Sequence, residues 1–397
     1  MTFYYSLGLM SGTSMDGVDA SIIQSDGVYT YKVILDKYFE YPKDIYKGLT
    51  KLRDKIKSSK DLKKFSKELK SLEKEITLFH AIAVNKIVKK SKVNIDFVGF
   101  HGQTIFHNSS EKISIQLGDG KLLSQLTNKT VVYNFRKNDL KNRGKGAPLS
   151  PIFHQLMVRK NKISFPVCVL NLGGIANVSF IYSHYPQDIF SSDVGPGNCL
   201  IDEWIRKNSK KKYDRDGLIA RSGKSKNNIV KKLRKNFTKI KQRKIFRQSL
   251  DIKDFDLSPV RGLSLEDGAA TLTDFTVQHL WFYIAFPIKK DEVDRVRLSK
   301  KYLKKIGLQK KIGPWTIVVC GGGRKNKFLM ESLRDFFHRY KNIIIKSIDD
   351  YGVNGDFVES QAFAYLAIRS YHEWPISFPS TTGVSKPCTG GIIIKNY

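Results

Sequence analysis

Apolar and polar positions along the chain follow two spacings, one typical of strands and one typical of helices. Tyr5 to Ile23 is apolar at both ends with Gly, Ser, Thr and Asp between, which predicts a strand, a loop and a second strand. From Asp61 to Ser91 apolar side chains recur at helical spacing, which predicts one long amphipathic helix. Ile95 to Phe100 predicts a buried strand that ends in a polar loop, His101 to Thr104.

The second half of the chain begins in the same way. Val167 to Leu172 and Ala176 to Ile181 predict two strands on either side of a glycine turn. Ile317 to Val319 predicts a further strand, and a helical pattern from Asn326 to His338 follows it; Gln361 to Tyr371 predicts a last helix. Strands that alternate with helices predict an α/β fold, and the two similar openings predict two related lobes on either side of a cleft.

A change in composition marks the expected boundary between the lobes. After a predicted strand at Thr130 to Phe135, the segment Arg136 to Pro148 is rich in Gly, Lys and Asn and predicts an irregular connector. We therefore expect a first lobe over residues 1–132 and a second over residues 133–349. The C-terminal segment, about residues 350–397, is expected to return to the first lobe.

The composition excludes several classes of protein. Hydrophobic residues make up 41% of the 397 residues, which is ample for buried cores and untypical of disorder. The N-terminus lacks the parts of a secretory signal, and no apolar run approaches the roughly 20 residues that cross a bilayer. The four cysteines lie far apart and predict small buried side chains rather than zinc ligands or disulfides. We expect a cytoplasmic protein without a membrane partner.

The net charge of +32 is the feature that would favour a nucleic-acid partner. Residues 206–247 hold 18 Lys or Arg against two Asp, so 18 − 2 = +16 lies in one stretch, and a second basic run spans residues 289–311. Neither run interleaves aromatic side chains with cations, as a base-stacking surface would. A Lys-, Asn- and Ile-rich drift of the surface accounts for the charge, so nucleic acid is disfavoured as a partner.

Met10 to Asp19 carries the first candidate chemistry. It contains two glycines, three hydroxyl side chains and two carboxylates between predicted strands. Glycines let backbone N–H groups approach an anion, and a carboxylate can hold the hydrated Mg²⁺ that accompanies a nucleotide. Without a lysine and a following helix, it is not a P-loop. On composition alone, a phosphate-binding loop and an ordinary polar turn fit equally well.

Further candidates lie in later polar and glycine-rich segments. Asp193 precedes a Gly-Pro turn and a helical pattern from Leu200 to Ile205, so it could act as a general base or simply cap the helix. Gly321 to Gly323 follow a strand, where a flat ligand such as a purine or a flexible connector would fit. His101 and Gln103 are candidates for lining a cleft.

Together these segments resemble the anhydro-N-acetylmuramic acid kinases of the actin, Hsp70 and hexokinase superfamily. The resemblance covers nearly the whole chain and rests on the order and spacing of these segments: Gly12–Asp19, His101–Thr104, Gly146–Leu149, Asn171–Asn177, Asp193–Asn198, Gly321–Gly323 and Glu359–Ala364. It implies a two-lobed actin-like (ribonuclease H-like) ATPase and sugar kinase fold with a central cleft. It also implies that 1,6-anhydro-N-acetylmuramic acid, ATP and water give N-acetylmuramic acid 6-phosphate and ADP, a step of peptidoglycan recycling.

The resemblance implies a role for each candidate residue. Asp193 would activate the water that attacks the anomeric carbon, while the released O6 attacks the γ-phosphate. Mg²⁺ would be held through water by either Asp16 or Asp19. The sugar would contact His101, Gln103, Gly197, Asn198 and Glu359. ATP would contact Gly12, Thr13, Ser14, Met15, Asp16, Gly17, Val18, Asp19, Gly173, Gly174, Asn177, Gly321, Gly322 and Gly323. The oligomeric state stays open, a homodimer included.

Two segments depart from the family pattern. Where relatives usually carry Ala-Gly-Gly-Gln-Gly-Ala-Pro-Leu, this chain has residues 142–149 with Arg143 and Lys145. Arg324 and Lys325 follow the glycine triplet where a small residue is common. These cations put nucleotide and sugar affinity in question. The alternatives are a sugar kinase without ring hydrolysis, a basic nucleic-acid-binding protein and an inactive kinase.

Overall fold

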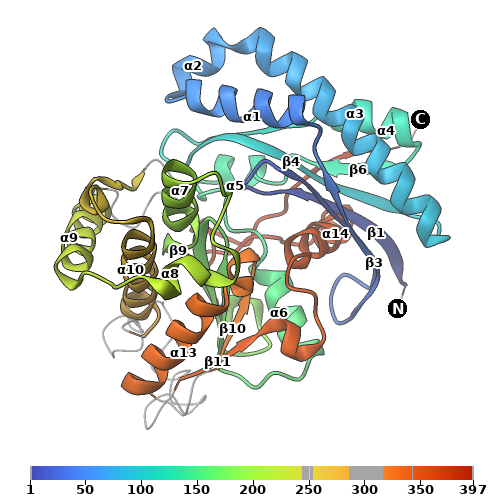
Figure 1. Cartoon of the computed structure of the whole chain (residues 1–397). Helices are drawn as coiled ribbons and strands as arrows, with labels where there is room; N and C mark the ends of the chain where they lie inside the picture. Colours follow the sequence, from blue (N-terminus) through green and yellow to red (C-terminus); the bar gives the residue numbers. More distant parts are fainter. Residues whose placement is uncertain (1, 244–249, 251–253, 286–315, 342, 396–397) are drawn as a thin grey trace. The chain divides into compact units, whose positions relative to one another are not determined.

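The computed structural model describes residues 2–243, 250, 254–285, 316–341 and 343–395 (Figure 1). The chain divides into two compact units: unit 1 comprises Met1–Lys162 and Asp356–Tyr397, and unit 2 comprises Ile163–Gly355. Residues 133–162, which the sequence placed in the second lobe, group with unit 1. One reason is the buried Asp139, whose carboxylate accepts hydrogen bonds from the Thr382 hydroxyl and the Gly146 N–H within that unit. Residues 244–247 and 289–311 of the two basic runs lie outside the described residues.

Unit 1 contains a mixed β-sheet of seven strands in the order β12-β6-β4-β1-β2-β3, with β5 paired to β4. The strands β1, β2 and β3 are antiparallel, and β4 and β6 continue the sheet parallel to β1. The strands are β1 (Tyr4–Ser11), β2 (Gly17–Ser25), β3 (Tyr31–Glu40), β4 (Phe97–Asn108), β5 (Ile113–Leu117), β6 (Thr130–Tyr133) and β12 (Ile392–Ile394). The helices are α1 (Lys43–Lys55), α2 (Ser59–Lys64), α3 (Ser66–Ser91), α4 (Gly120–Thr127), α5 (Lys137–Lys141), α6 (Pro151–Lys160) and α14 (Val358–Tyr371).

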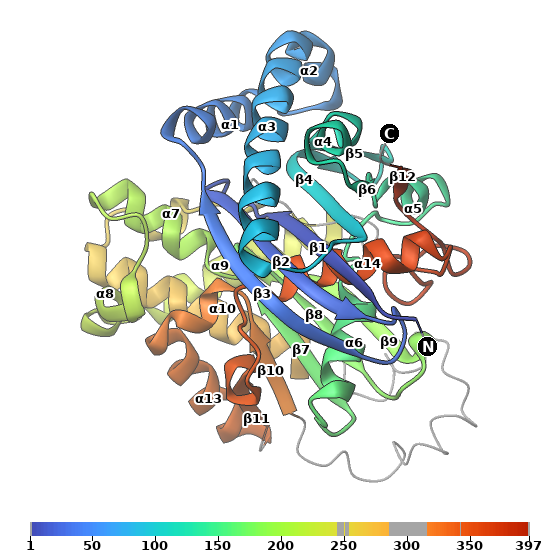
Figure 2. The ribbon, with the colours of Figure 1, turned by 90° about the vertical axis from the view of Figure 1, so that its right-hand side faces the viewer.

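Helices cover both faces of this sheet, as Figure 2 shows for α3. Side chains alternate along β1, so Leu7 and Leu9 join the apolar core that contains α3 residues, whereas Ser6 bonds to the carbonyl of Ala364 on α14. Gly8 lies on the α14 face, where an added Cβ would stand 1.9 Å from the Ser360 carbonyl oxygen. The glycine is therefore required by the close approach of the helix.

Two sequence predictions for unit 1 were wrong. The helix expected over residues 61–91 is split at Phe65, which ends α2 and precedes α3 with a non-helical ψ of 24°. The polar segment His101 to Thr104 is not a loop, because β4 continues through it to Asn108. The second half of β4 pairs with β5, a strand that was not predicted from the sequence. Gly102, with a φ of 72°, lies where the register of β4 against β1 shifts, between the pairs Leu9–Phe100 and Ser11–Gln103.

Unit 2 contains a five-stranded sheet in the order β11-β10-β7-β8-β9. The strands are β7 (Val167–Leu172), β8 (Ile175–Ile181), β9 (Ile189–Pro196), β10 (Thr316–Cys320) and β11 (Ile344–Ser347). The α-helices are α7 (Cys199–Asn208), α8 (Leu218–Ser222), α9 (Asn227–Arg243), α10 (Leu265–Ala285) and α13 (Lys327–Lys341). Short 3₁₀ helices are η1 (Pro186–Asp188), η2 (Arg215–Gly217), η4 (Ser258–Val260), η5 (Gly322–Lys325) and η6 (Ile348–Tyr351). Apolar residues of α10 and α13 pack with β7, β8 and β10 in one core, and α7 to α10 form a second.

The two sheets share one topology. In each, three strands form an antiparallel meander, β1–β2–β3 in unit 1 and β7–β8–β9 in unit 2. The strand β4 or β10 adds parallel to the first of them, and β6 or β11 adds parallel to that strand. Unit 1 has β5 and β12 in addition. The first hairpin of each sheet, β1–β2 and β7–β8, is one of the two strand-loop-strand openings found in the sequence. A ribonuclease H-like sheet that occurs twice is the arrangement of actin-like ATPases and sugar kinases, so the predicted fold class is confirmed.

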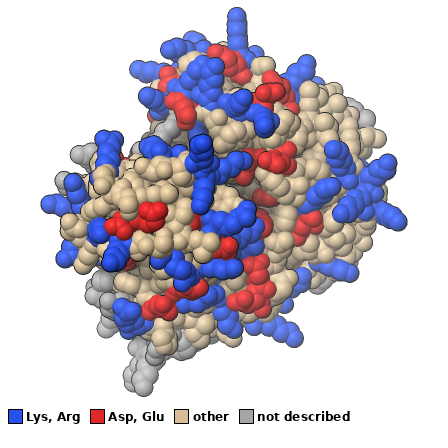
Figure 3. All heavy atoms as spheres, in the orientation of Figure 1, with Lys and Arg blue, Asp and Glu red and all other residues tan. Residues whose placement is uncertain are grey.

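The basic stretch 206–247 is in part the solvent face of helix α9. Val230 and Leu233 are buried in the second core of unit 2, whereas Lys231 and Lys232 are exposed. This is the amphipathic pattern of an ordinary surface helix. Figure 3 shows Lys and Arg side chains scattered over one face of the molecule, with Asp and Glu between them.

Two other expectations concern the cysteines and the membrane. All four cysteines are buried, and none forms a disulfide, as predicted. Among the described residues, no helix combines the length and the apolar character needed to cross a bilayer.

Candidate functional site

The turn between β1 and β2 is the first part of the candidate site. It spans residues 12–16 only, because Gly17, Val18 and Asp19 already belong to β2. The Met15 N–H donates to the Gly12 carbonyl at 3.2 Å, and Met15 has a φ of 59°. The side chains of Met15 and Val18 are buried in the apolar core, so of the residues expected to contact ATP, these two have only backbone groups to offer.

Buried polar side chains form hydrogen bonds with the start of this turn and with Ser11, the residue before it. Gln103 lies opposite Ser11 in the parallel pairing of β4 with β1, and its amide donates to the Gly12 carbonyl oxygen at 2.9 Å. Nδ1–H of His80 donates to the carbonyl of Ile76, so Nε2 is left as an acceptor for the Ser11 hydroxyl at 3.4 Å. Ser11 in turn accepts from the Tyr41 hydroxyl at 2.9 Å. Burial lowers the pKa of His80 to about 4, which keeps the ring neutral.

His101 is buried and bonded through both ring nitrogens. Nδ1–H donates to the Gly102 carbonyl at 2.7 Å, and Nε2 accepts from the Arg136 guanidinium at 2.9 Å. Burial, together with the charge of Arg136, lowers the pKa of His101 to about 3. A neutral ring with both nitrogens engaged orients Arg136, and it has no nitrogen left for a sugar hydroxyl.

In unit 2 the structure brings together three glycine segments that are distant in sequence. The N–H groups of Gly197 and Asn198 donate to the carbonyls of Gly174 and Gly173, each at 2.9 Å. A Cβ on Gly323 would stand 2.5 Å from Leu172 and 2.6 Å from the Asn198 amide, so the triplet after β10 packs on the same turn. The end of β7, the start of α7 and the start of η5 thus form one backbone cluster.

Asp193 lies at the edge of this cluster, within β9, which also includes Gly195 and Pro196 of the expected turn. Its register partner on β8 is Asn177, and the next pair is Ala176 with Gly195, so Val194 is bulged out. The Val194 carbonyl accepts a hydrogen bond from Nε2 of the buried His279 at 2.7 Å. Bulges commonly re-aim a neighbouring side chain. One Asp193 oxygen accepts the Leu250 N–H at 3.1 Å.

Three glycines of these turns have a property in common. Gly12, Gly173 and Gly322 have no positive φ, and an added Cβ would meet no described atom closer than 3.8 Å, 3.4 Å and 4 Å respectively. By contrast, Gly321 has a φ of 81° and its Cβ would stand 2.3 Å from Asn171. Neither backbone conformation nor packing within the chain therefore demands glycine at these three positions. Close approach of a bound molecule would demand it.

Two buried oxygens add to this observation. Two buried oxygens have no hydrogen-bond partner among the described residues: Oε1 of Gln103, whose amide nitrogen bonds to the β1–β2 turn, and Oδ1 of Asn177 on β8. Buried polar atoms are almost always hydrogen-bonded in native proteins. Orphaned oxygens beside both glycine turns are consistent with a ligand or water at each.

Carboxylates also gather near the β1–β2 turn. Asp16 is exposed and accepts the Ser14 hydroxyl, while Asp19 is half-buried on β2. Burial raises the pKa of Tyr38, and the charges of Asp16, Glu40 and Asp19 raise it further, so the three carboxylates lie around this ring. No group of three or more His, Cys, Asp or Glu side chains in the described part of the chain forms a closed metal site. Asp16 and Asp19 fit a cation held through water.

Glu359 lies half-buried in the first turn of α14. The adjacent Ser360 bonds to the Ser21 hydroxyl on β2 at 2.6 Å, which ties this end of the helix to the sheet of unit 1.

Several residues that support the site were not predicted from the sequence. His80, Tyr41 and His279 carry no local motif, and each acts on a residue that is far away in the chain. A histidine at an apolar position of a helical pattern is the only signal that could have singled out His80 or His279.

The sequence model of the anhydro-N-acetylmuramic acid kinase family matches residues 4–396. The chain is 55% identical to the anhydro-N-acetylmuramic acid kinase of Pelagibacter ubique (strain HTCC1062) over 395 residues, covering 100% of this chain and 99% of that protein. It is 36% identical to the protein of that name from Zymomonas mobilis over 400 residues, covering 98% and 99%.

Solved structures give weaker matches. Component A of (R)-2-hydroxyglutaryl-CoA dehydratase from Acidaminococcus fermentans has a TM-score of 0.42 at 12% identity, covering 93% of this chain and 99% of that one. A ROK family glucokinase from Streptomyces griseus, in complex with glucose and AMPPNP, has a TM-score of 0.38 at 10% identity, covering 91% and 98%. Likeness at this level carries no argument about function.

Proposed function

The chain belongs to the anhydro-N-acetylmuramic acid kinase family, and on this premise we propose the reaction that it catalyses and the residues that carry it. The chain is an ATP-dependent kinase that opens the 1,6-anhydro ring of 1,6-anhydro-N-acetylmuramic acid and phosphorylates O6. The products are N-acetylmuramic acid 6-phosphate and ADP, and the reaction serves peptidoglycan recycling in the cytoplasm.

The observation that carries this proposal is the set of three glycines without an internal reason to be glycine. Gly12 and Gly173 occupy equivalent positions, in the first hairpin of each ribonuclease H-like sheet, and Gly322 follows the fourth strand of the second sheet. We assign the two hairpin turns to the phosphates of ATP and the Gly321–Gly323 turn to its adenosine. Backbone N–H groups of glycine turns are suited to bind phosphate oxygens.

Asp193 is assigned as the general base. Its carboxylate would take a proton from water as the water oxygen attacks C1 of the sugar. The C1–O6 bond then breaks, and O6 attacks the γ-phosphorus while the bond to the bridging oxygen of ADP breaks. The Val194 bulge, held by His279, sets the direction of Asp193, and Asn177 lies opposite it on β8.

Mg²⁺ would be held through water by Asp16 or Asp19 and would neutralise charge on the phosphates. The two residues stand on either side of the start of β2 and share the surroundings of Tyr38. The hydroxyl of Ser14 orients Asp16. The remaining hydroxyl of this turn, on the exposed Thr13, is assigned to a phosphate oxygen.

Of the five residues expected to contact the sugar, we assign three to direct contact and two to an indirect role. Glu359, Gly197 and Asn198 remain assigned to the sugar. His101 and Gln103 act indirectly, because the first orients Arg136 and the second holds the Gly12 carbonyl. Lys145 is half-buried in the segment that departs from the family, and we keep it as a cation that favours an anionic sugar. A homodimer is compatible with these assignments.

One assay tests substrate and reaction together. The purified protein is incubated with the anhydro sugar, Mg²⁺-ATP and ¹⁸O-labelled water, and the product is analysed by mass spectrometry. We expect a sugar 6-phosphate with one ¹⁸O at the anomeric hydroxyl. A phosphorylated product without the label would support the sugar kinase without ring hydrolysis. If the protein forms neither ADP nor product but binds duplex or single-stranded nucleic acid in a salt-sensitive way, the kinase assignment fails.

A further inference from the structure

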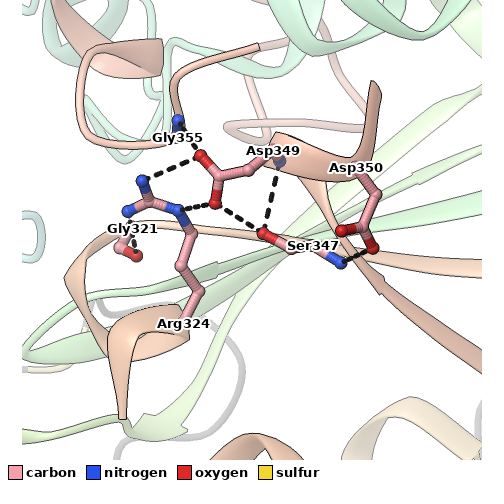
Figure 4. A network of polar contacts seen from close by, with 6 residues as sticks. All are labelled: Gly321, Arg324, Ser347, Asp349, Asp350 and Gly355. Carbon is pink, nitrogen blue, oxygen red and sulfur yellow. Dashed lines mark hydrogen bonds and ion pairs between the residues drawn. The ribbon is translucent and has the colours of Figure 1, made fainter. Parts of the chain in front are cut away.

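Arg324, one of the two cations that follow the glycine triplet, lies in a polar cluster of unit 2. The Arg324 cluster comprises Gly321, Arg324, Ser347, Asp349 and Gly355 (Figure 4). From the sequence, a cation here was expected to disturb nucleotide affinity. The structure shows instead that its charge is turned inward and paired.

The guanidinium and the Asp349 carboxylate lie side by side and form two hydrogen bonds. Nε contacts Oδ2 at 2.6 Å, and the Nη2 group contacts Oδ1 at 3.0 Å. The Arg324 side chain is only 5% exposed, whereas that of Asp349 is 45% exposed. This bidentate geometry is specific to arginine, since a lysine ammonium has no planar fork.

The remaining bonds of the cluster join two loops. The Nη1 group of Arg324 donates to the Gly321 carbonyl at 3.1 Å, and the Gly321 N–H donates to the Gly355 carbonyl at 3.2 Å. The Gly355 N–H donates to Oδ1 of Asp349 at 3.1 Å, and the Ser347 hydroxyl donates to Oδ2 at 2.6 Å. Burial alone would raise the pKa of Asp349, but the hydrogen bonds from Arg324, Ser347 and the Gly355 N–H outweigh it and lower the pKa to about 2, so the carboxylate stays charged.

The cluster fixes the backbone on one side of the Gly321–Gly323 turn. The turn is open at Gly322, where an added Cβ would meet no described atom within 4 Å. Gly355 is shaped by the same cluster, because a Cβ there would stand 2.4 Å from Nε of Arg324. A rigid turn with one open face presents a fixed surface to a flat ligand.

We propose that Arg324 is a positioning residue of the nucleotide site: its ion pair with Asp349 holds the Gly321–Gly323 turn in the conformation that binds adenosine. The inference rests on the proposed function, which assigns this turn to adenosine. Arg324 acts through the backbone and supplies no group to the reacting phosphate. It therefore affects the binding of the nucleoside part of ATP, and neither the sugar nor the chemical step.

The test compares Arg324→Ala and Arg324→Lys with a matched control, Arg221→Ala. Arg221 also pairs with a carboxylate of unit 2, that of Glu331, but at an exposed position that is not part of the cluster. Calorimetry gives the Kd of ATP, ADP and inorganic tripolyphosphate, and the coupled assay gives kcat and the KM of both substrates. Melting temperatures are recorded for each variant.

We expect Arg324→Ala to raise the Kd and KM for ATP about tenfold, the order of effect of losing one charge-assisted bidentate pair. Tripolyphosphate affinity, the KM for the sugar and kcat should stay within about twofold. Arg324→Lys should recover part of the loss, and Arg221→Ala should match the wild type. Asp349→Asn, which keeps the shape of the side chain, should weaken ATP in the same way if Arg324→Ala fails to fold.

An unchanged Kd for ATP in Arg324→Ala would overturn the inference. So would an equal loss of tripolyphosphate affinity, or an equal effect of Arg221→Ala, because each would mean a general change of the fold. Failure of the proposed function looks different. A wild-type protein that binds ATP without phosphorylating the sugar would refute that function, while the calorimetric comparison would still decide the role of Arg324.

Discussion

The variant Gly322→Ala tests whether glycine is required at this position by a bound ligand or by the fold. The added methyl group would meet no described atom within 4 Å, and the native φ is not positive, so the folded chain accepts it. Replacing glycine by alanine at a compatible position stabilises a protein by roughly 0.4–1 kcal/mol, because the unfolded chain loses freedom. We therefore expect the melting temperature of Gly322→Ala to stay the same or rise.

The same methyl group would occupy the space assigned to adenosine. Forcing an extra carbon into a packed contact typically costs about 1–3 kcal/mol. At 1.4 kcal/mol for each factor of ten, the KM for ATP should rise roughly 5- to 150-fold. The coupled assay with saturating sugar and varied ATP measures this rise, and kcat should change little because the turn is assigned to adenosine and not to the reacting phosphate.

Two controls sharpen the comparison. Gly262→Ala adds a methyl group to an equally open position whose φ is 86°, so it should lower the melting temperature and leave the KM for ATP unchanged. Gly321→Ala should destabilise the protein, because its Cβ would stand 2.3 Å from Asn171. If Gly322→Ala is stable and its KM for ATP stays within twofold of the wild type, the adenine ring of ATP does not lie on this turn.

Three further predictions concern unit 2. Asp193→Asn should lower kcat by about 10²–10⁴, the usual contribution of a general base, while the calorimetric Kd for ATP is unchanged; normal turnover would remove Asp193 as the base. His279→Ala should release the Val194 carbonyl and lower kcat more than it raises the KM for ATP, with partial recovery in His279→Gln; equal changes in both constants would contradict the positioning role. Burial raises the pKa of Asp202 from 3.8 to about 6, so the unfolded chain loses this proton at a lower pH than the folded chain does. The free energy of unfolding therefore falls as pH rises from about 4 through 6. Above pH 7, Asp202→Asn should increase the free energy of unfolding by on the order of 3 kcal/mol and therefore raise the melting temperature. Near pH 4 the melting temperature should be unchanged, and thermal melts at both pH values would check this.

Local patterns in the sequence were enough to predict the two strand-loop-strand openings. Each opening combines apolar strands with a glycine turn, and both signals lie within about twenty residues of each other. The helices α13 and α14 were also predicted from a local pattern, the recurrence of apolar residues at helical spacing. The missed strand β3 has no clean alternation, because it is largely half-buried along its length as the last strand of its sheet.

The arrangement of the candidate site could be predicted only in part. The glycine segments at Gly173, Gly197 and Gly321 and the residue Asp193 were found from composition and family resemblance, and they are neighbours within unit 2. The groups that support them were not found, because the partners are joined only by the fold: His279 and Val194 are 85 residues apart, and Gln103 and Gly12 are 91 apart. The inward pairing of Arg324 with Asp349 likewise depends on a contact across 25 residues.

The close contact of α14 with the sheet of unit 1 determines the order in which the protein can be completed during synthesis. Gly8 and Gly99 both face this helix at distances that no side chain would allow, and the edge strand β12 follows later still. Unit 2 is one continuous stretch, so its whole sheet exists once residue 355 has been translated. The β1–β2 hairpin is therefore translated well before α14 and β12, the elements that complete its unit and follow unit 2 along the chain.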